Sequence, residues 1–330
     1  MPLPAAPLTL LAAAAAALAG CAALVDARAD RREAGWEAAF PPTGQFVQVE
    51  GRRVHLLVSG PARRGQPDIV LIHGANGNLR DFSFDLIDRL DDTHRVIAVD
   101  RPGMGWSEGL GEADSDPAEQ ARILAAALTQ LGVQTPLLVG HSYGGAVAMA
   151  WALADPDAAG VVLLAGATYP WQGKALGAWY RLNATPLGAS ARAMASALAP
   201  EAMVDQALAG VFAPAPVPAG YSAHFGPGLA LRREAMAANT RQVNALHEAL
   251  TRQSPGYATL TLPIDILHGD ADTIVGLEIH SRRMVAEVGS ARLQVIDGGG
   301  HMPHHSHPET VVAAIQRALQ RAQNSAESPS

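Results

Sequence analysis

The sequence predicts an α/β fold in which a mostly parallel sheet is flanked by helices and interrupted by a helical insertion. Short apolar runs alternate with amphipathic stretches of helical length over most of the chain, and such runs are typical of buried parallel strands. This alternation stops between residues 169 and 260, which are rich in Ala, Pro and Met, and then resumes. A β-α-β-α order requires a parallel sheet with helices on its faces.

Before the insertion, the chain opens with an antiparallel hairpin, residues 46–50 and 53–58, joined at a Gly51 turn. Asp116 and Pro117 suit the N-cap and the first position of a helix. The other elements expected here are strands at 68–72, 95–99, 136–139 and 160–165, and helices at 79–90, 117–131 and 145–154.

After the insertion we expect strands at 264–267 and 292–296 and helices at 277–288 and 308–319. The polar end of the chain is expected to be disordered. The predicted organisation is a leader over 1–25, a linker over 26–45, an α/β core over 46–168 and 261–320, a helical cap over 169–260 and a disordered tail over 321–330.

Composition limits the function classes. With 330 residues, 48% of them hydrophobic, the chain can bury a full core. The net charge is −7 and no basic patch is evident, so nucleic acid is not an expected partner. The single cysteine, Cys21, excludes an internal disulfide and a multi-cysteine metal site.

The N-terminus carries an apolar stretch, residues 8–19, followed by Gly20 and Cys21. The run 18–21, Leu-Ala-Gly-Cys, resembles a bacterial lipobox, which implies export, cleavage and lipid attachment at Cys21. Ala22 would then imply the outer membrane. Residues 1–20 contain no Lys or Arg, whereas an export signal normally starts with basic residues. Two alternatives therefore stay open: an uncleaved membrane anchor over 8–25, which is just long enough, and an Ala-rich leader on a cytosolic protein.

The most informative motif is Gly-His-Ser-Tyr-Gly at 140–144, which fits the G-x-S-x-G pattern of a nucleophile elbow. In such an elbow a strand turns sharply into a helix and exposes the central serine. An apolar run precedes the motif and a helix-like stretch follows it, as the elbow requires. Glycines flank the serine because a side chain would clash with the neighbouring strand and helix.

Five segments, each expected at the carboxyl end of a strand, together resemble the α/β-hydrolase superfamily over about residues 45–320. Ligands bind at that edge of an open parallel sheet. The segments are His73-Gly-Ala-Asn76, Asp100-Arg-Pro-Gly-Met-Gly-Trp-Ser107, the elbow, Gly269-Asp-Ala-Asp-Thr273 and Gly299-Gly-His-Met-Pro303.

The resemblance implies a catalytic triad. Ser142 is the expected nucleophile and needs an adjacent base. His301 is the expected base, since it comes last in the family order of serine, acid and histidine. His304, His305 and His307 are expected to be solvated or at a helix start. No nearby carboxylate or thiol set suggests a metal site, and no cofactor is expected.

The triad acid is Asp272 or Asp270, which chemistry alone does not separate. The family pattern G-x-x-D selects Asp272. An oxyanion hole needs two backbone N–H groups. The elbow supplies that of Tyr143, and the resemblance implies Ala75 for the second, with Asn76 as the alternative. His73 is expected to brace this loop.

The expected function is that of a serine hydrolase which cleaves a carboxylic ester through an acyl-enzyme, as a carboxylesterase does. The same triad also suits C–C bond or lactone hydrolysis, peptide cleavage, acyl transfer and perhydrolysis. A catalytically idle hydrolase-fold module that binds a ligand is the alternative from another class. Specificity is expected to come from the cap, whose aromatic residues are Trp171, Trp179, Tyr180, Phe212, Tyr221 and Phe225.

Overall fold

A computed structural model describes residues 5–172 and 177–327. Its described part contains one eight-stranded sheet in the order β1-β2-β4-β3-β5-β6-β7-β8. The pairs β1–β2 and β2–β4 are antiparallel and all others are parallel. The strands are β1 (Gln45–Val49), β2 (Arg52–Ser59), β3 (Ile69–Ile72), β4 (Val96–Val99), β5 (Leu137–His141), β6 (Gly160–Leu164), β7 (Ile264–Gly269) and β8 (Ala291–Ile296).

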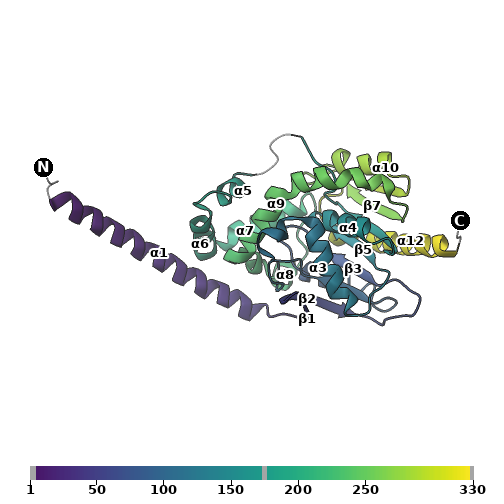
Figure 1. Cartoon of the computed structure of the whole chain (residues 1–330), viewed down its shortest axis with the longest axis horizontal. Helices are drawn as coiled ribbons and strands as arrows, with labels where there is room; N and C mark the ends of the chain where they lie inside the picture. Colours follow the sequence, from purple (N-terminus) through teal and green to yellow (C-terminus); the bar gives the residue numbers. More distant parts are fainter. Residues whose placement is uncertain (1–4, 173–176, 328–330) are drawn as a thin grey trace.

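Helices cover both faces of the sheet (Figure 1). One core cluster joins the sheet to α3 (Pro117–Thr129), α4 (Tyr143–Ala154) and α10 (Arg283–Glu287). A second joins the other face to α2 (Arg80–Ser83) and α12 (Pro308–Glu327). The short elements η1 (Gly111–Ser115), η4 (Glu278–Arg282) and α11 (Pro303–Ser306) lie in connections of this core. The predicted α/β fold class is confirmed.

The central strands of the sheet are more buried than its edge strand β1. Every residue of β3, β4, β5, β6 and β7 is buried, as expected for central strands covered on both faces. The edge strand β1 instead alternates between exposed and buried positions towards its end. Because β3 to β8 run parallel to one another, their carboxyl ends share one edge of the sheet, and the candidate site lies there.

The insertion is helical, as predicted. It lies between β6 and β7, and its described elements are α5 (Ala178–Asn183), α6 (Gly188–Leu198), α7 (Glu201–Phe212), α8 (Tyr221–Phe225), η2 (Pro227–Leu231), α9 (Arg233–Gln253) and η3 (Ser254–Thr259). We call this unit the cap.

Two local predictions are wrong. The expected helix over 79–90 is helical only in α2, and turns then bury Leu86, Ile87 and Leu90. Apolar periodicity reports which side of a segment is buried, and successive turns can bury the same side. The tail is also ordered further than expected, because α12 continues to Glu327. Arg321 anchors this extension, since its Nη1 donates to Asp265 Oδ2 at 2.5 Å.

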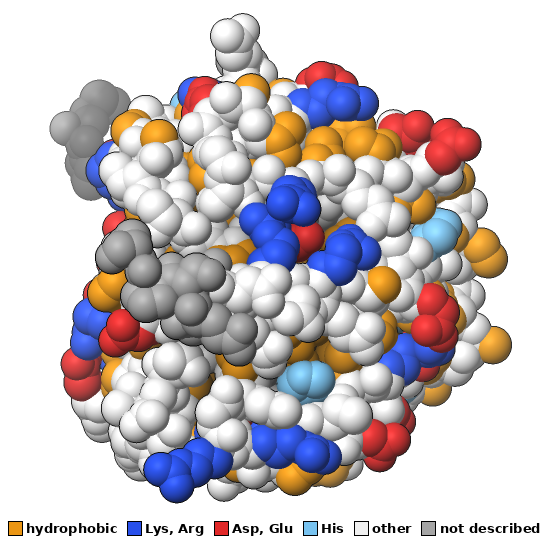
Figure 2. Space-filling view, turned by 90° about the vertical axis from the view of Figure 1, so that its right-hand side faces the viewer, with side chains coloured by type: hydrophobic (Ala, Val, Ile, Leu, Met, Phe, Trp, Pro, Cys, Tyr) orange, Lys and Arg blue, Asp and Glu red, His pale blue; other side chains and the backbone are white. Residues whose placement is uncertain are grey.

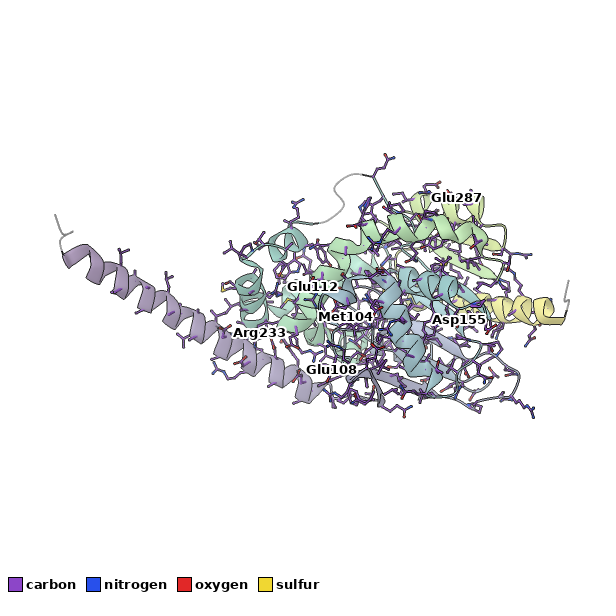
Figure 3. All side chains as sticks on the ribbon, viewed as in Figure 1. Met104, Glu108, Glu112, Asp155, Arg233 and Glu287 are labelled. Carbon is purple, nitrogen blue, oxygen red and sulfur yellow. The ribbon has the colours of Figure 1, made fainter. Side chains whose placement is uncertain are left out.

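The N-terminal helix α1 (Ala5–Ala39) is continuous through the predicted leader and most of the predicted linker (Figure 1). Its second half packs on the cap, where Arg28 and Arg32 donate to the carbonyls of Ala197 and Ala199 at 2.8 Å. Arg233 of α9 pairs with Glu33 at 2.9 Å and lies beside α1 in Figure 3. The segment that the sequence predicted as a linker is therefore helical and docked on the cap.

Within the described chain, one helix is long and apolar enough to cross a membrane, Leu10–Ala39, by length and composition alone. Cys21 lies on it and is exposed. On the face of the molecule in Figure 2, basic and acidic side chains are interspersed without a large patch of either sign.

Candidate active site

The elbow forms where β5 ends and α4 begins. Ser142 connects them with φ 52° and ψ −119°, a conformation that non-glycine residues rarely adopt. A Cβ at Gly144 would lie 2.1 Å from the carbonyl oxygen of Ile72, so only glycine fits there. The Ser142 N–H donates to the Leu164 carbonyl at 3.0 Å, which ties the elbow to β6. Strain held in this way by the surrounding structure is typical of functional sites.

His301 and Asp272 meet at the same edge of the sheet. His301 Nδ1 lies 2.7 Å from Asp272 Oδ2, and both side chains are buried. His268 Nε2 approaches the same oxygen at 3.2 Å, and Oδ1 accepts the N–H groups of Ile274 and Val275. Burial alone would raise the pKa of Asp272, but the hydrogen bonds from His268 and His301 hold it well below its usual value. The carboxylate therefore stays ionised.

Asp270 occupies a different position, although it follows the same strand. Its side chain is exposed, and its Oδ1 accepts the N–H of Gly298 at 2.7 Å. This bond closes the turn before the His301 loop. Of the two aspartates that the chemistry left open, Asp272 is the one that contacts His301.

The loop after β3 runs beside Ser142. A Cβ at Gly74 would lie 3.0 Å from the Ser142 Cβ, which shows how closely the two backbones approach. The Asn76 N–H donates to Asn239 Oδ1 at 2.9 Å. The Ala75 N–H has no hydrogen-bond acceptor among the described residues. Of the two alternatives for the second oxyanion-hole donor, the geometry therefore leaves the Ala75 N–H available.

His73 braces this loop, as expected, since its Nδ1 donates to the Gly74 carbonyl at 2.8 Å. Its Nε2 accepts the N–H of Arg101 at 3.0 Å. Burial, with the Arg101 charge nearby, lowers the pKa of His73 to about 4, so the ring is neutral at pH 7.

Arg101 is a support that the sequence analysis missed. It is fully buried and donates to the carbonyls of His73 and Gly74 at 2.9 Å. Its guanidinium stacks over the Tyr143 ring at 4.3 Å. Arg101 thus connects the two loops from which the oxyanion hole is expected. Its place in the Asp100–Ser107 motif was visible, but only the fold shows where the guanidinium points.

Of the other histidines near His301, His304 and His305 lie at the start of α11, as one of the two expectations had it, but neither side chain is solvated. His304 is fully buried, and its Nε2 lies 3.1 Å from Asp81 Oδ2. His305 Nε2 lies 2.8 Å from Asp81 Oδ1. His307 is only partly buried and contacts Ser306. Asp81 comes from α2, so the sequence around the histidines gave no sign of a carboxylate.

Ser142 and His301 both line a cavity of about 630 Å³ between the core and the cap, a size typical of small-molecule sites. The described residues that line it include neither Lys nor Arg. Trp171 lies outside the lining and packs on His247. The cap side chains on the cavity wall are mostly aromatic or aliphatic and include Trp179, Tyr180, Met203, Leu208, Val211, Phe212, Tyr221 and Phe225.

The chain belongs to the alpha/beta hydrolase family, whose model matches residues 69–314. It is 27% identical to a 2-hydroxymuconate semialdehyde hydrolase of Pseudomonas putida, over 86% of this chain and 96% of that protein. The protein is therefore a hydrolase of this family, with a hydrolase among its relatives.

Solved structures share the fold. An esterase from Exiguobacterium antarcticum aligns with a TM-score of 0.64 at 21% identity, over 84% of this chain and 100% of that chain. A membrane phospholipase A aligns with a TM-score of 0.64 at 23% identity, over 97% of this chain and 98% of that chain. The second alignment covers so much of this chain that it includes most of α1.

Proposed function

We propose that the protein is a serine hydrolase that cleaves carboxylic esters with an apolar acyl group, through an acyl-enzyme. The observation that carries this proposal is the position of Ser142, on a strained elbow and in the same apolar cavity as a histidine paired with a buried aspartate.

In the proposed reaction, Ser142 attacks the ester carbonyl while His301 Nε2 takes the serine proton. Asp272 holds the opposite ring nitrogen and stabilises the imidazolium that forms. The N–H groups of Ala75 and Tyr143 receive the negative charge of the tetrahedral oxygen. His301 then protonates the leaving alcohol, and water releases the acid from Ser142 in a second round. No cofactor takes part.

The lining of the cavity supports an apolar substrate. Aromatic and aliphatic cap residues form most of the wall, and no cation on the described lining would pair with an anionic group on the substrate. Fully burying a methylene is worth about 0.8 kcal/mol. Lengthening the acyl chain should therefore raise kcat/KM stepwise until the cavity is full.

A nitrophenyl ester series of increasing acyl length tests this proposal. We expect kcat/KM to rise from acetate towards longer chains, and Ser142→Ala to abolish turnover of all of them. A preference for acetate, or for substrates with a free carboxylate, would contradict the apolar acyl assignment.

The other reactions open to the same triad are C–C bond and lactone hydrolysis, peptide cleavage, acyl transfer and perhydrolysis. The Pseudomonas putida relative, by its name, acts on a semialdehyde. A ring-fission product of that type, a lactone and a peptide run beside the ester series would separate these reactions. If none is turned over and a fluorophosphonate fails to label Ser142, the binding-module alternative is favoured.

We further propose that the N-terminus attaches the protein to a membrane of the cell envelope, with Cys21 as the lipid attachment site. The lipobox-like run and the exposed apolar half of α1 support this proposal. Two or more acyl chains give stable anchoring.

Cys21→Ser should then release the protein from membranes, and wild-type intact mass should lack residues 1–20. Membrane retention of Cys21→Ser with residues 1–20 still present would favour the uncleaved anchor. A wild type that is soluble from the start would contradict both.

A further inference from the structure

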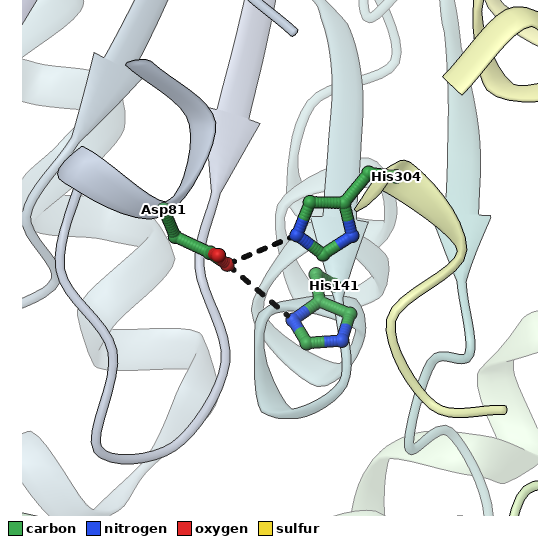
Figure 4. A group of neighbouring side chains, drawn as sticks. All are labelled: Asp81, His141 and His304. Carbon is green, nitrogen blue, oxygen red and sulfur yellow. Dashed lines mark hydrogen bonds and ion pairs between the residues drawn. The ribbon is translucent and has the colours of Figure 1, made fainter. Parts of the chain in front are cut away.

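A group of buried metal-ligating side chains lies beside the elbow, outside the proposed triad. Asp81 from α2, His141 from the end of β5 and His304 from α11 converge in Figure 4. Each offers one ligand atom, and these atoms lie within 4.8 Å of one another. All three residues are at most 4% exposed. The three segments are far apart in the sequence, which is why local patterns gave no sign of this group.

The hydrogen bonding of His141 leaves a lone pair aimed at a carboxylate. His141 Nε2 lies 3.0 Å from the carbonyl oxygen of His301, and a carbonyl only accepts, so Nε2 carries the proton. Nδ1 is then unprotonated. It is buried, has no hydrogen-bond partner among the described residues and lies 3.9 Å from Asp81 Oδ2. Two facing acceptors of this kind repel each other unless a cation or a donor lies between them.

The far sides of the same residues are already held by other groups. Asp81 Oδ1 accepts from the Tyr221 hydroxyl at 2.7 Å and from His305 Nε2 at 2.8 Å. His141 is fixed by the His301 carbonyl. Such outer contacts are what orient the ligands of a metal centre. The inner atoms, including Asp81 Oδ2 and His141 Nδ1, are left facing one another.

From this arrangement we propose that Asp81, His141 and His304 form a binding site for a divalent transition-metal cation of the zinc type. Two imidazoles and one carboxylate are a ligand set that zinc uses. Bonds of about 2.0–2.1 Å at tetrahedral angles put ligand atoms about 3.3 Å apart. Asp81 Oδ2 and His304 Nε2 are 3.1 Å apart, and the 3.9 Å gap to His141 must close by about half an ångström. The two imidazole nitrogens lie within 4.8 Å of each other, so they must also approach, by at most about 1.5 Å.

Proton accounting allows this binding without ionising a new group. Without a metal, His304 Nε2 donates to Asp81, and His304 Nδ1 is buried with no hydrogen-bond partner in the described part of the chain. With a metal on Nε2, the ring proton moves to Nδ1. Asp81 and His141 also line the cavity, so a water molecule can complete the coordination from there.

The ion would join α2, the elbow and the loop that follows His301, so its expected effect is stabilisation of the site rather than chemistry on the substrate. The proposal therefore does not depend on the reaction proposed above. The alternative occupant of the gap is a bridging water that donates to both His141 Nδ1 and Asp81 Oδ2.

Zinc binding by the full chain in detergent tests the site. The protein is first freed of metal with a chelator and then given zinc. We expect the wild type to retain one zinc per chain through gel filtration and to unfold at a higher temperature with zinc bound. Asp81→Asn and His304→Gln should each weaken zinc binding by more than the roughly 10- to 100-fold that loss of an outer contact costs. His307→Gln, a histidine outside the group, should bind zinc like the wild type.

X-ray absorption at the zinc edge provides a second test on the wild type, which does not depend on whether the variants fold. We expect two imidazoles and oxygen ligands and no sulfur. The proposal would be overturned if the wild type retained no zinc, or if the absorption spectrum showed a sulfur ligand from Cys21. It would also be overturned if folded Asp81→Asn and His304→Gln bound zinc as tightly as the wild type. A bridging water would then be left as the occupant of the gap.

Discussion

Replacing Asp272 with asparagine is expected to move the ring proton of His301 from Nδ1 to Nε2. Asp272 Oδ1 accepts the N–H groups of Ile274 at 2.8 Å and Val275 at 3.0 Å, while Oδ2 faces His301. In the variant, the amide oxygen must stay where the two N–H donors point. The NH₂ group then takes the place of Oδ2 and donates to His301 Nδ1.

The proton of His301 must consequently move to Nε2, the nitrogen that should accept the serine proton. The ionised partner of the imidazolium is also lost. In a serine triad this change costs about 10⁴ in kcat, or about 5 kcal/mol at 1.36 kcal/mol per tenfold. The variant loses the 3.2 Å contact with His268 Nε2, which keeps its bond to the Val275 carbonyl. The fold should survive, because the side chain keeps its shape and both backbone hydrogen bonds.

Asp270→Asn is the matched control. Its amide oxygen can still accept the Gly298 N–H, so kcat should change by no more than a few-fold. The assay is kcat on a saturating nitrophenyl ester, with the thermal midpoint measured on both variants. Equal losses of kcat in the two variants, at unchanged midpoints, would refute the assignment of Asp272.

Three further outcomes are expected. The pKa of His73 is about 4 in the folded protein against an ordinary 6.5, so below pH 6.5 the unfolded chain binds a proton that the folded chain does not. Up to about 3 kcal/mol of the free energy of unfolding should therefore be lost between pH 6.5 and 4. A free energy of unfolding in urea that stays constant over this range would contradict this. Gly74→Ala should lower kcat/KM about tenfold or more, because its Cβ would crowd Ser142. Gly177→Ala, whose Cβ would meet no atom of the described residues within 4 Å, should not lower it, and equal activities would be the contrary result. Deleting residues 1–25 should leave a folded, active enzyme, whereas deleting 1–40 should lower the thermal midpoint because Arg233 loses its partner Glu33; equal midpoints would argue against a docked α1.

The sheet and the elbow were predictable because their rules are local. A buried parallel strand must be a short apolar run, and the backbone contact at Gly144 permits no side chain. Long-range contacts leave no such local trace. Nothing around His304 indicated that Asp81 would reach it, and nothing around Arg101 indicated that it would hold the Gly74 loop. The docking of residues 26–39 on the cap depends on partners such as Arg233, about 200 residues away in the chain.

The proposed acyl-enzyme can be trapped directly. The full chain is mixed with nitrophenyl butyrate, quenched in acid during turnover and measured by intact mass and peptide mapping. We expect one butyryl adduct, on the peptide containing Ser142, and neither adduct nor turnover in Ser142→Ala. An adduct on another residue, or retention of more than a few per cent of kcat by Ser142→Ala, would contradict the central claim that this serine is the nucleophile.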